Sequence, residues 1–443
     1  MKYLKKTDPQ IAQFIRKEKR RQQETLMMIP SENIASAAVE EAVGSCLANK
    51  YAEGYPFKRY YQGQQFVDQV ESLAIDRAKK AFGVPHVNVQ PYSGSPANSA
   101  VYFSLLSPGD TLMGLSLAHG GHLTHGASVS FSGKYFRSVT YQLGKDGRLD
   151  YDLIEKIALK EKPKIIIAGI TAYPLRVDWK KFAIIADKVQ AYLMADIAHL
   201  AGLVVADVYP SPVPYVHIVT TTTHKTLRGP RGAMIMVTER GLKKDTDLAK
   251  KIDRAVFPGL QGGPHINTIA GIAVALKEAS SIQFKSYAAQ IIKNAQTLAE
   301  ELKKQQFNLV AGGTESHLIL VDLTNKGLIG NLAAEALEEA GIVLNRNAVP
   351  FDQNPPFYPS GMRMGTPGIT SRGMKEKEMK KIGQWIGAVV DEVAEIKKKI
   401  KINFSQEKKT EVRKKIIARS KMVKKIKIEV KKLCQKFPIK KVY

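Results

Sequence analysis

Four short, continuous apolar runs constrain the fold of this chain more than any other feature. Turn or helix signals separate the runs, which lie at 164–170 (KIIIAGI), 191–195 (AYLMA), 217–221 (HIVTT) and 233–237 (AMIMV). Runs of this kind are typical of strands that are buried on both faces of a largely parallel sheet. The sequence therefore predicts an α/β fold with a mostly parallel central sheet.

The chain is long enough for more than one domain. Its 443 residues exceed the size at which a single hydrophobic core keeps growing. Ile11, Phe14 and Ile15 predict one short amphipathic helix near the N-terminus, and after Pro264 the pattern changes to amphipathic helices with a strand at 317–323. We predict an N-terminal arm over 1–29, a large domain over 30–275 and a smaller α+β domain over 276–443.

Most of the positive charge lies in the C-terminal tail. The whole chain has a formal net charge of +26, and 396–443 holds 19 Lys or Arg against 3 Glu. Apolar residues recur in this tail close to helical spacing, at Val412, Ile416, Val423, Ile426, Val430 and Leu433. This pattern predicts a helix that docks by one stripe and turns its lysines to water. A basic surface for nucleic acid or anionic membrane is the open alternative.

The sequence gives no sign of export or membrane insertion. Cys46 and Cys434 are the two cysteines, and they are too far apart in sequence to suggest a disulfide framework or a metal-binding pair. The N-terminus is basic but lacks the apolar stretch of a secretory signal, and every apolar run is too short to cross a bilayer. We expect a cytoplasmic protein without a membrane segment.

Two polar residues follow neighbouring candidate strands. Lys225 comes just after the run at 217–221, and Asp196 directly follows the run at 191–195. Ligands of doubly wound sheets bind beyond the carboxyl ends of the strands, where a lysine can react with a bound aldehyde. An ionised aspartate beside the ring nitrogen is what pyridoxal phosphate requires, and His199 could bond its ring oxygen. Taken alone, Lys225 is more simply read as a surface lysine, and His199 fits a structural role equally well.

A phosphate cradle is the second candidate feature. Ser93, Gly94 and Ser95 precede a predicted helix that starts near Pro96, and backbone N–H groups at a helix N-terminus suit a dianionic phosphate. The same residues are also common as plain helix caps.

His119, His122 and His125 are spaced three apart, which suggests either a metal site or stacking of one imidazole on a planar cofactor. No acidic or cysteine ligand lies nearby to complete a tetrahedral site, so we expect no metal.

Glu53 lies among aromatic residues and could carry a proton in catalysis. The same loop could equally form a subunit contact.

Eight motifs together resemble the serine hydroxymethyltransferase family. In chain order they are Ser31-Glu32-Asn33, KYAEGYP, QPYSGSPAN, GGHLTHG, MADIAHLAG, TTTTHKTLRGPRG, FPGLQGGP and SGMRMGTP. The resemblance implies the type I fold of pyridoxal-phosphate enzymes, as in aspartate aminotransferase. It also implies reversible transfer of the serine hydroxymethyl group to tetrahydrofolate, giving glycine and 5,10-methylenetetrahydrofolate. A homodimer with shared active sites is expected, and a tetramer stays open.

The resemblance also implies a role for each matched residue. Lys225 is the Schiff-base lysine, Asp196 pairs with the pyridine nitrogen and His122 stacks on the cofactor. Ser93, Gly94 and Ser95 hold the phosphate, while His199, Thr171 and His224 surround the ring oxygen and the Schiff base. Arg363 and Ser31 grip the substrate carboxylate, and Asn347 contacts the folate. Tyr51, Glu53, Tyr61 and the Gly262-Gly263 loop serve the neighbouring subunit's cofactor, with Glu53 moving protons.

Some positions depart from the family pattern. Pro30 replaces an alanine, and Phe57 and Gln62 replace glycines. Leu175 replaces an arginine, whose role the next residue, Arg176, could take over. Phe57 and Gln62 lie in the loop expected at the folate mouth, so the folate carrier is the least constrained part of the prediction. A folate-independent aldolase acting on 3-hydroxy amino acids, and a nucleic-acid-binding role for the tail, are the alternatives.

Overall fold

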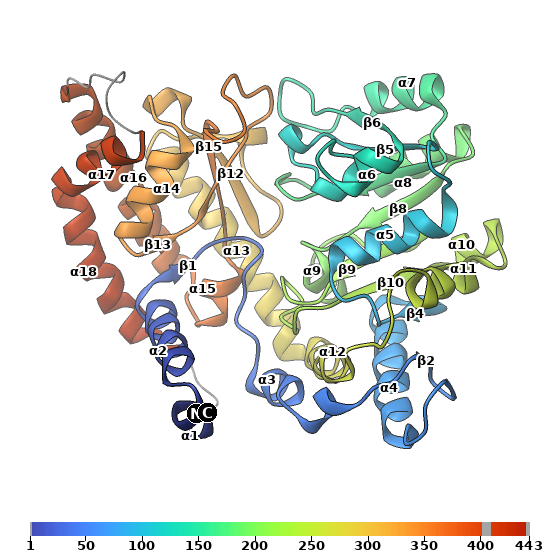
Figure 1. Cartoon of the computed structure of the whole chain (residues 1–443). Coiled ribbons are helices and arrows are strands. Elements are labelled where there is room, and N and C mark those ends of the chain that lie inside the picture. Colours follow the sequence, from blue (N-terminus) through green and yellow to red (C-terminus); the bar gives the residue numbers. More distant parts are fainter. Residues whose placement is uncertain (1, 401–408, 440–443) are drawn as a thin grey trace. The chain divides into compact units, whose positions relative to one another are not determined.

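A computed structural model describes residues 2–400 and 409–439 (Figure 1). These residues form two compact units: 2–32 with 293–400 and 409–439 make one, and 33–292 make the other. We call them the arm unit and the sheet unit. The boundary falls within helix α13 (Ile282–Lys304). The assignment of functional domains to 1–29, 30–275 and 276–443 stays a prediction.

The sheet unit contains a seven-stranded sheet in the order β4-β10-β9-β8-β7-β5-β6. Its strands are β4 (His86–Asn88), β5 (Thr111–Leu115), β6 (Arg137–Tyr141), β7 (Ile165–Gly169), β8 (Tyr192–Asp196), β9 (Ile218–Thr222) and β10 (Ala233–Val237). Strands β6, β5, β7, β8 and β9 pair in parallel, and β10 runs antiparallel to β9 and β4. The four apolar runs are β7 to β10 within one residue at each end, which confirms the predicted α/β class.

The apolar runs are continuous because both faces of the sheet are covered. Every residue of β7, β9 and β10 is buried. Helix α5 contributes Ala97, Val101 and Tyr102 to a core shared with strand residues such as Ile165 and Ile235. The helices of this unit are α3 (Ala37–Val43), α4 (Gln65–Phe82), α5 (Gly94–Leu105), α6 (Phe131–Tyr135), α7 (Tyr151–Glu161), α8 (Trp179–Lys188), α9 (Ala201–Val205), α10 (Glu239–Lys244), α11 (Leu248–Arg254) and α12 (Ile266–Ala279).

The arm unit is an antiparallel sheet with helices and one continuous core. Its sheet has the order β11-β12-β15-β14, made of β11 (Asn308–Leu309), β12 (Leu318–Asp322), β14 (Asn345–Asn347) and β15 (Gly361–Gly365). A second, parallel pair joins β1 (Leu26–Met27) to β13 (Ile342–Val343). The helices are α1 (Lys2–Thr7), α2 (Pro9–Glu24), α14 (Gly330–Glu339), α15 (Pro367–Ser371), α16 (Glu376–Lys399), α17 (Lys409–Arg419) and α18 (Lys421–Lys436).

The predicted tail helix is two helices, α17 and α18, which we call the C-terminal extension. Ser420 separates them because its Oγ caps α18, accepting from the Val423 N–H at 3.0 Å. Glu392 of α16 accepts from the Ser420 hydroxyl and the Met422 N–H. All six residues of the predicted stripe are buried in the arm-unit core, and lysines such as Lys424 and Lys425 are exposed. The docked-helix prediction is confirmed here; the parts of the tail at 401–408 and 440–443 lie outside the described residues.

The predicted N-terminal amphipathic helix exists as α2, and its large apolar residues are exposed on the single chain. Ile11, Phe14 and Ile15 are 45%, 57% and 43% exposed, and the one fully buried residue of α2 is Ala12. The helix approaches its neighbours through a small side chain and through backbone carbonyls at its C-terminal end, so its large apolar residues are left on the outside.

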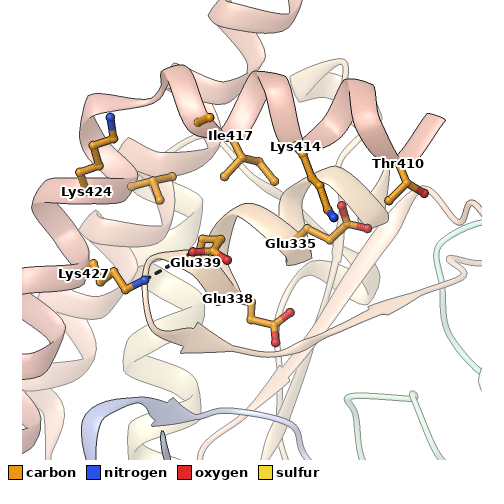
Figure 2. A pocket seen from close by; sticks show the side chains of 10 residues that line it. Glu335, Glu338, Glu339, Thr410, Lys414, Ile417, Lys424 and Lys427 are labelled. Atoms are coloured by element: carbon orange, nitrogen blue, oxygen red, sulfur yellow. Dashed lines mark hydrogen bonds and ion pairs between the residues drawn. The ribbon is translucent and has the colours of Figure 1, made fainter. Parts of the chain in front are cut away.

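A cavity of about 450 Å³ lies between the extension and α14. Figure 2 shows glutamates of α14 facing lysines of the extension across it, with Lys427 bonded to Glu339 at 3.4 Å. Its walls come from surface helices of the arm unit alone, and none of the predicted site residues lines it.

Candidate active site

Asp196 and Lys225 lie at the same edge of the parallel sheet. Asp196 is the last residue of β8 and is opposite Thr220 of the parallel strand β9, which ends three residues before Lys225. The two segments are also tied together after the strands end. Thr226 Oγ1 donates to the His199 carbonyl at 3.0 Å and accepts from the Gly202 N–H at 3.0 Å. Parallel strand pairing thus brings the predicted lysine and aspartate to one edge.

The Asp196 carboxylate accepts three hydrogen bonds. Oδ2 accepts from Asn98 Nδ2 at 2.8 Å and from His125 Nε2 at 3.0 Å, and Oδ1 accepts from the Ala198 N–H at 3.0 Å. Burial raises the pKa of Asp196, but the hydrogen bonds that the carboxylate accepts from His125 and Asn98 outweigh this effect and hold the pKa well below its usual range. Asp196 is therefore ionised.

Gly169, at the end of β7, makes room for this pair. A Cβ built on Gly169 would meet His125 Cε1 at 2.5 Å and Asp196 Cβ at 2.9 Å. Both distances are shorter than a real Cβ contact, so any side chain there would displace the imidazole or the carboxylate. Thr171 follows two residues later, and its N–H donates to the carbonyl of Gly120, between His119 and His122, at 2.8 Å.

His122 belongs to the same hydrogen-bonded group. Its Nδ1 is 2.8 Å from Thr124 Oγ1, and Thr124 Oγ1 accepts from Asn98 Nδ2 at 2.8 Å. The His122 and His125 ring centroids are 5.7 Å apart. His122 is half-buried, whereas His125 and Thr124 are buried. The predicted stacking histidine is therefore linked to the predicted pyridine partner through Thr124 and Asn98.

The predicted phosphate cradle lies at the start of α5. Helix α5 begins at Gly94, and the Ser93 side chain makes no capping hydrogen bond to it. A Cβ at Gly94 would meet Thr222 Cγ2 at 2.8 Å, so the glycine lets the helix start approach the carboxyl end of β9. Ser95, in the first turn, accepts the Ser99 hydroxyl through its carbonyl at 2.8 Å. The cradle thus lies against the end of β9, the strand that Lys225 follows.

His224 is a neutral imidazole beside Lys225. Burial, and then the positive charges of Arg231 and Lys225, lower the pKa of His224 to about 3. Its Nδ1 is buried and makes no hydrogen bond within the described chain. Lys225 is half-buried, and its backbone carbonyl accepts from Asn33 Nδ2 at 2.9 Å. A buried nitrogen without a partner is a position that a bound ligand can satisfy.

A second group of predicted residues gathers around the Gly262-Gly263 loop. Tyr51 Oη donates to Glu53 Oε1 at 3.0 Å, and the Tyr61 ring lies edge-on to the Tyr51 ring at 5.2 Å. A Cβ at Gly262 would lie 3.2 Å from Glu53 Oε1, and one at Gly263 would lie 3.0 Å from the Tyr51 ring. The hydrogen bond to Glu53 raises the pKa of Tyr51. All five residues thus come together within one chain.

Three predicted substrate residues belong to the arm unit. Arg363 is a buried residue of β15, opposite Asn345 of β14, and its Nε donates to Asn345 Oδ1 at 3.2 Å. Burial lowers the pKa of Arg363 to about 10, so the guanidinium stays charged at neutral pH. Asn347 pairs with Gly361 on the same two strands.

Ser31 lies close to the end of β15. A Cβ on Gly365 would be 2.8 Å from Pro30 Cα, so the chain just before Ser31 packs directly on this strand. The arm unit therefore brings the segment of Ser31 next to the strand that carries Arg363.

Sequence reasoning missed the residues that hold Asp196. Asn98 was read only as part of a motif, as was Thr220, which donates to Asn98, and His125 was considered for a metal site. Within 2–400 and 409–439, no group of three or more His, Cys, Asp and Glu side chains could hold a metal ion. His119 instead accepts the Leu143 N–H at 3.2 Å, and burial lowers its pKa. The available signal for Asn98 was a polar residue one turn into the helix that starts at the predicted cradle.

The chain matches the family model described as Serine hydroxymethyltransferase over residues 4–386. The chain belongs to the serine hydroxymethyltransferase family. Serine hydroxymethyltransferases of Desulfotalea psychrophila and Acidothermus cellulolyticus are 59% and 58% identical to it over 391 and 392 residues, covering 88% of this chain and 90% of each relative. The serine hydroxymethyltransferase of Legionella pneumophila is 54% identical over 391 residues, or 88% of this chain and 93% of the relative.

Membership confirms the resemblance, the type I fold class and the cofactor. The serine hydroxymethyltransferase family depends on pyridoxal phosphate, so this chain is a pyridoxal-phosphate-dependent transferase. The family match ends at residue 386, and α17 and α18 lie beyond it. Among the described residues, no helix is both long and apolar enough to cross a bilayer.

The residues of the sheet edge fit pyridoxal phosphate. The cofactor carries a pyridine nitrogen, an aldehyde and a phosphate, and the edge offers an ionised carboxylate, a lysine and a helix N-terminus in turn. A ligand would satisfy the Nδ1 of His224, which has no hydrogen-bond partner within the described chain, and the Ser93 hydroxyl, which makes no capping hydrogen bond to α5. The donor set therefore agrees with the cofactor that the family requires.

Proposed function

We propose that the chain transfers the serine hydroxymethyl group reversibly to tetrahydrofolate, giving glycine and 5,10-methylenetetrahydrofolate. The observation that carries the proposal is the ionised Asp196 at the same sheet edge as Lys225, with α5 starting beside them. When bound there, pyridoxal phosphate would supply an aldehyde for the amino group of serine and a protonated ring that accepts electron density from the α-carbon.

The sheet-unit side chains would hold this cofactor. Lys225 would bind its aldehyde, and Asp196 would keep the hydrogen on its ring nitrogen, because an ionised carboxylate stabilises a neighbouring cation. Ser93, Gly94 and Ser95 would bind its phosphate at the positive end of α5. His224, neutral at physiological pH, can donate or accept one hydrogen bond without adding charge.

The substrate is proposed to be held and protonated by other residues. Arg363, charged and buried, would bind the serine carboxylate with Ser31, which fixes the orientation of the α-carbon. Glu53, bonded to Tyr51, would move a proton at the serine hydroxyl and at the one-carbon unit. Asn347 is proposed to contact the folate. Phe57, with a φ of +63°, occupies a backbone conformation that glycine adopts without strain, so this folate-side loop keeps its shape despite the replaced glycine.

A homodimer is part of the proposal. Large apolar side chains are exposed on the single chain, including Ile11 and Phe14 on α2 and Phe103 and Tyr135 in the sheet unit. Phe103 and Tyr135 line an apolar cavity of about 600 Å³ with Leu260, which is two residues before Gly262. An apolar surface beside the loop proposed to serve a neighbour is suited to a second copy of the chain. Sedimentation of wild type and Phe103→Glu tests this; a monomeric wild type would refute it.

Lys225→Ala tests the catalytic assignment. We expect this variant to keep its circular dichroism spectrum and to lose serine turnover, because Lys225 is the one lysine in the segment between β9 and β10. Lys424→Ala, an exposed lysine of the extension, is the matched control and should retain full activity. Hydride reduction of the wild type should fix the cofactor on Lys225, and label fixed on another lysine would contradict the assignment.

Folate dependence separates the proposal from the aldolase alternative. Wild-type protein should convert serine to glycine rapidly only when tetrahydrofolate is present. Equal rates with and without tetrahydrofolate would favour the folate-independent aldolase. The reaction is proposed to take place in the cytoplasm, where the two cysteines, free in the structure, stay reduced.

A further inference from the structure

Asn98 is the centre of a buried hydrogen-bond network whose hydrogens can all be assigned. The residue is 1% exposed and lies in the first half of α5. Its amide faces Asp196 Oδ2 at 2.8 Å, Thr124 Oγ1 at 2.8 Å and Thr220 Oγ1 at 2.7 Å. An ionised carboxylate only accepts, so the atom that faces Asp196 must be Nδ2. Its Oδ1 therefore accepts from the Thr220 hydroxyl, and the orientation of the amide is fixed.

The orientation of Asn98 determines where the hydrogen of Thr124 goes. Nδ2 donates to Thr124 Oγ1, so the one hydroxyl hydrogen of Thr124 is left for His122 Nδ1 at 2.8 Å. The Thr124 backbone N–H, which can only donate, also faces this nitrogen at 3.3 Å. His122 Nδ1 must therefore accept, and the imidazole carries its hydrogen on Nε2.

The hydrogen of the His125 imidazole is placed by the same argument, starting from its Nδ1. Its Nδ1 accepts from the His122 backbone N–H at 3.2 Å, so its hydrogen is on Nε2 and is donated to Asp196 Oδ2 at 3.0 Å. Each donor in the network thus meets an acceptor, with Asp196 ionised and both imidazoles neutral. A hydrogen on the Nδ1 of either imidazole would point at a backbone N–H, so that two donors would face each other without an acceptor.

We propose that Asn98 is a positioning residue that keeps Asp196 ionised and His122 neutral at the same time. The inference rests on the proposed function, in which both side chains contact one cationic pyridine ring. A carboxylate attracts that ring, and a neutral imidazole avoids the repulsion that an imidazolium would bring. Asn98 suits both needs because one amide nitrogen donates to Asp196 and, through Thr124, directs a hydrogen to His122.

Asn98→Asp is the sharpest test, because it preserves the shape and replaces the donating nitrogen by an accepting oxygen. The Thr124 hydroxyl then has an acceptor at residue 98 and no longer has to donate to His122. We expect nitrogen NMR of histidine-labelled protein to show the His122 Nδ1 resonance moving away from its wild-type position as the hydrogen bond from the Thr124 hydroxyl is lost, with the resonance assigned from a His122→Asn sample. We also expect the dissociation constant for pyridoxal phosphate to rise about tenfold or more.

Two further variants keep the test decisive. Thr124→Val removes the hydroxyl between Asn98 and His122 and should shift the His122 resonances in the same direction, which serves if Asn98→Asp does not fold. Asn88→Asp is the matched control, since Asn88 is 2% exposed and its Nδ2 donates to the Asp253 carboxylate at 2.8 Å. It should lower the melting temperature comparably while leaving His122 and the cofactor affinity unchanged.

The outcomes separate the two proposals. His122 nitrogen shifts that stay at wild-type values in both Asn98→Asp and Thr124→Val overturn the role of Asn98, whatever the activity. The same is true if Asn88→Asp shifts His122 as strongly. A wild type that neither binds pyridoxal phosphate nor turns over serine refutes the proposed function instead, and the histidine shifts of the cofactor-free protein still test Asn98.

Discussion

Arg59 shows how single buried charges hold the loop of Glu53 in place. Its Nε and Nη2 bond Asp68 at 2.9 Å and Glu71 at 2.6 Å, and Nη1 donates to the carbonyls of Ala52 and Gly54 on either side of Glu53. Burial raises the pKa of Glu71, and the charge of Arg59 opposes this. The guanidinium thus compensates two carboxylates and positions the backbone of the proposed proton carrier.

Arg59→Met should strongly destabilise the protein. Removing one partner leaves a buried charge uncompensated, which costs about 3–5 kcal/mol in folding free energy. Urea unfolding should show the loss. Arg148→Met removes an exposed partner of Asp146 at 3.9 Å and should change the free energy by less than about 1 kcal/mol. An Arg59→Met protein as stable as Arg148→Met would contradict the assigned role.

His224 should make stability depend on pH in a defined direction. Its pKa falls from 6.5 in the unfolded chain to about 3 in the folded protein. As pH drops below 6.5, the unfolded state gains a proton that the folded state does not, so stability is lost progressively toward pH 3. His217, with a pKa lowered to about 4, adds a dependence of the same sign.

His224→Asn isolates its share of this effect. The variant should lose less stability than wild type between neutral pH and about pH 5, as measured by the midpoint of urea unfolding at each pH. Identical pH profiles for the two proteins would show that His224 is not the buried neutral imidazole described above.

At the scale of elements, Arg372 joins the C-terminal ends of α2 and α18. Its guanidinium donates to five carbonyls: those of Gln22, Gln23 and Thr25 at the end of α2, and those of Cys434 and Phe437 at the end of α18. Last-turn carbonyls lack partners within their own helix and carry the negative end of its dipole. Gln23 adds a reciprocal pair of bonds with the backbone of Ile439. One planar cation therefore fixes the extension to the N-terminal helix.

Arg372→Lys should loosen both helices, because an ammonium has three donors where the guanidinium uses five. We expect a loss of about 2–3 kcal/mol and faster amide hydrogen exchange in α2 and α18 than in the central strands. Arg240→Lys, whose partner Asp187 is exposed, is the matched control. Unchanged exchange in α2 and α18 would show that Arg372 does not connect them.

At the scale of the whole molecule, the extension is part of the fold although it lies beyond the family match. Val412, Ile416, Val423, Ile426, Val430 and Leu433 are buried in the same core as the strands of the arm unit. Each such side chain contributes about 1.5–3 kcal/mol on burial, so together they are comparable with the total stability of a typical protein.

Removing residues 400–443 should therefore yield aggregated or unfolded protein in sedimentation and melting experiments. Replacing the exposed lysines Lys421, Lys424 and Lys425 by glutamate should leave the melting temperature nearly unchanged, since they face water. A truncated protein that melts like wild type would contradict the packing.

The triple variant also tests the nucleic-acid alternative. That alternative is favoured if wild type retains RNA in a salt-sensitive way and the triple variant does not.

Local patterns were enough to predict the central strands and the residue types of the site. Strands buried on both faces leave continuous apolar runs, so β7 to β10 were found within a residue. Lys225 and Asp196 were paired correctly at one edge because parallel strands end on the same side. The buried stripe of the extension was also predicted correctly, because buried residues of a helix repeat at a fixed period.

Tertiary structure alone decided what local patterns do not encode. The exposure of Ile11, Phe14 and Ile15 depends on which neighbours α2 meets, not on its own periodicity. The contacts of Asn98 and His125 with Asp196 join residues 98 and 71 positions apart, so no sequence period could reveal them. The sequence by itself determined the strands, the chemical groups and the edge where they meet. Folding decided the hydrogen positions and ionisation of that site, because these depend on atoms brought into contact from distant parts of the chain.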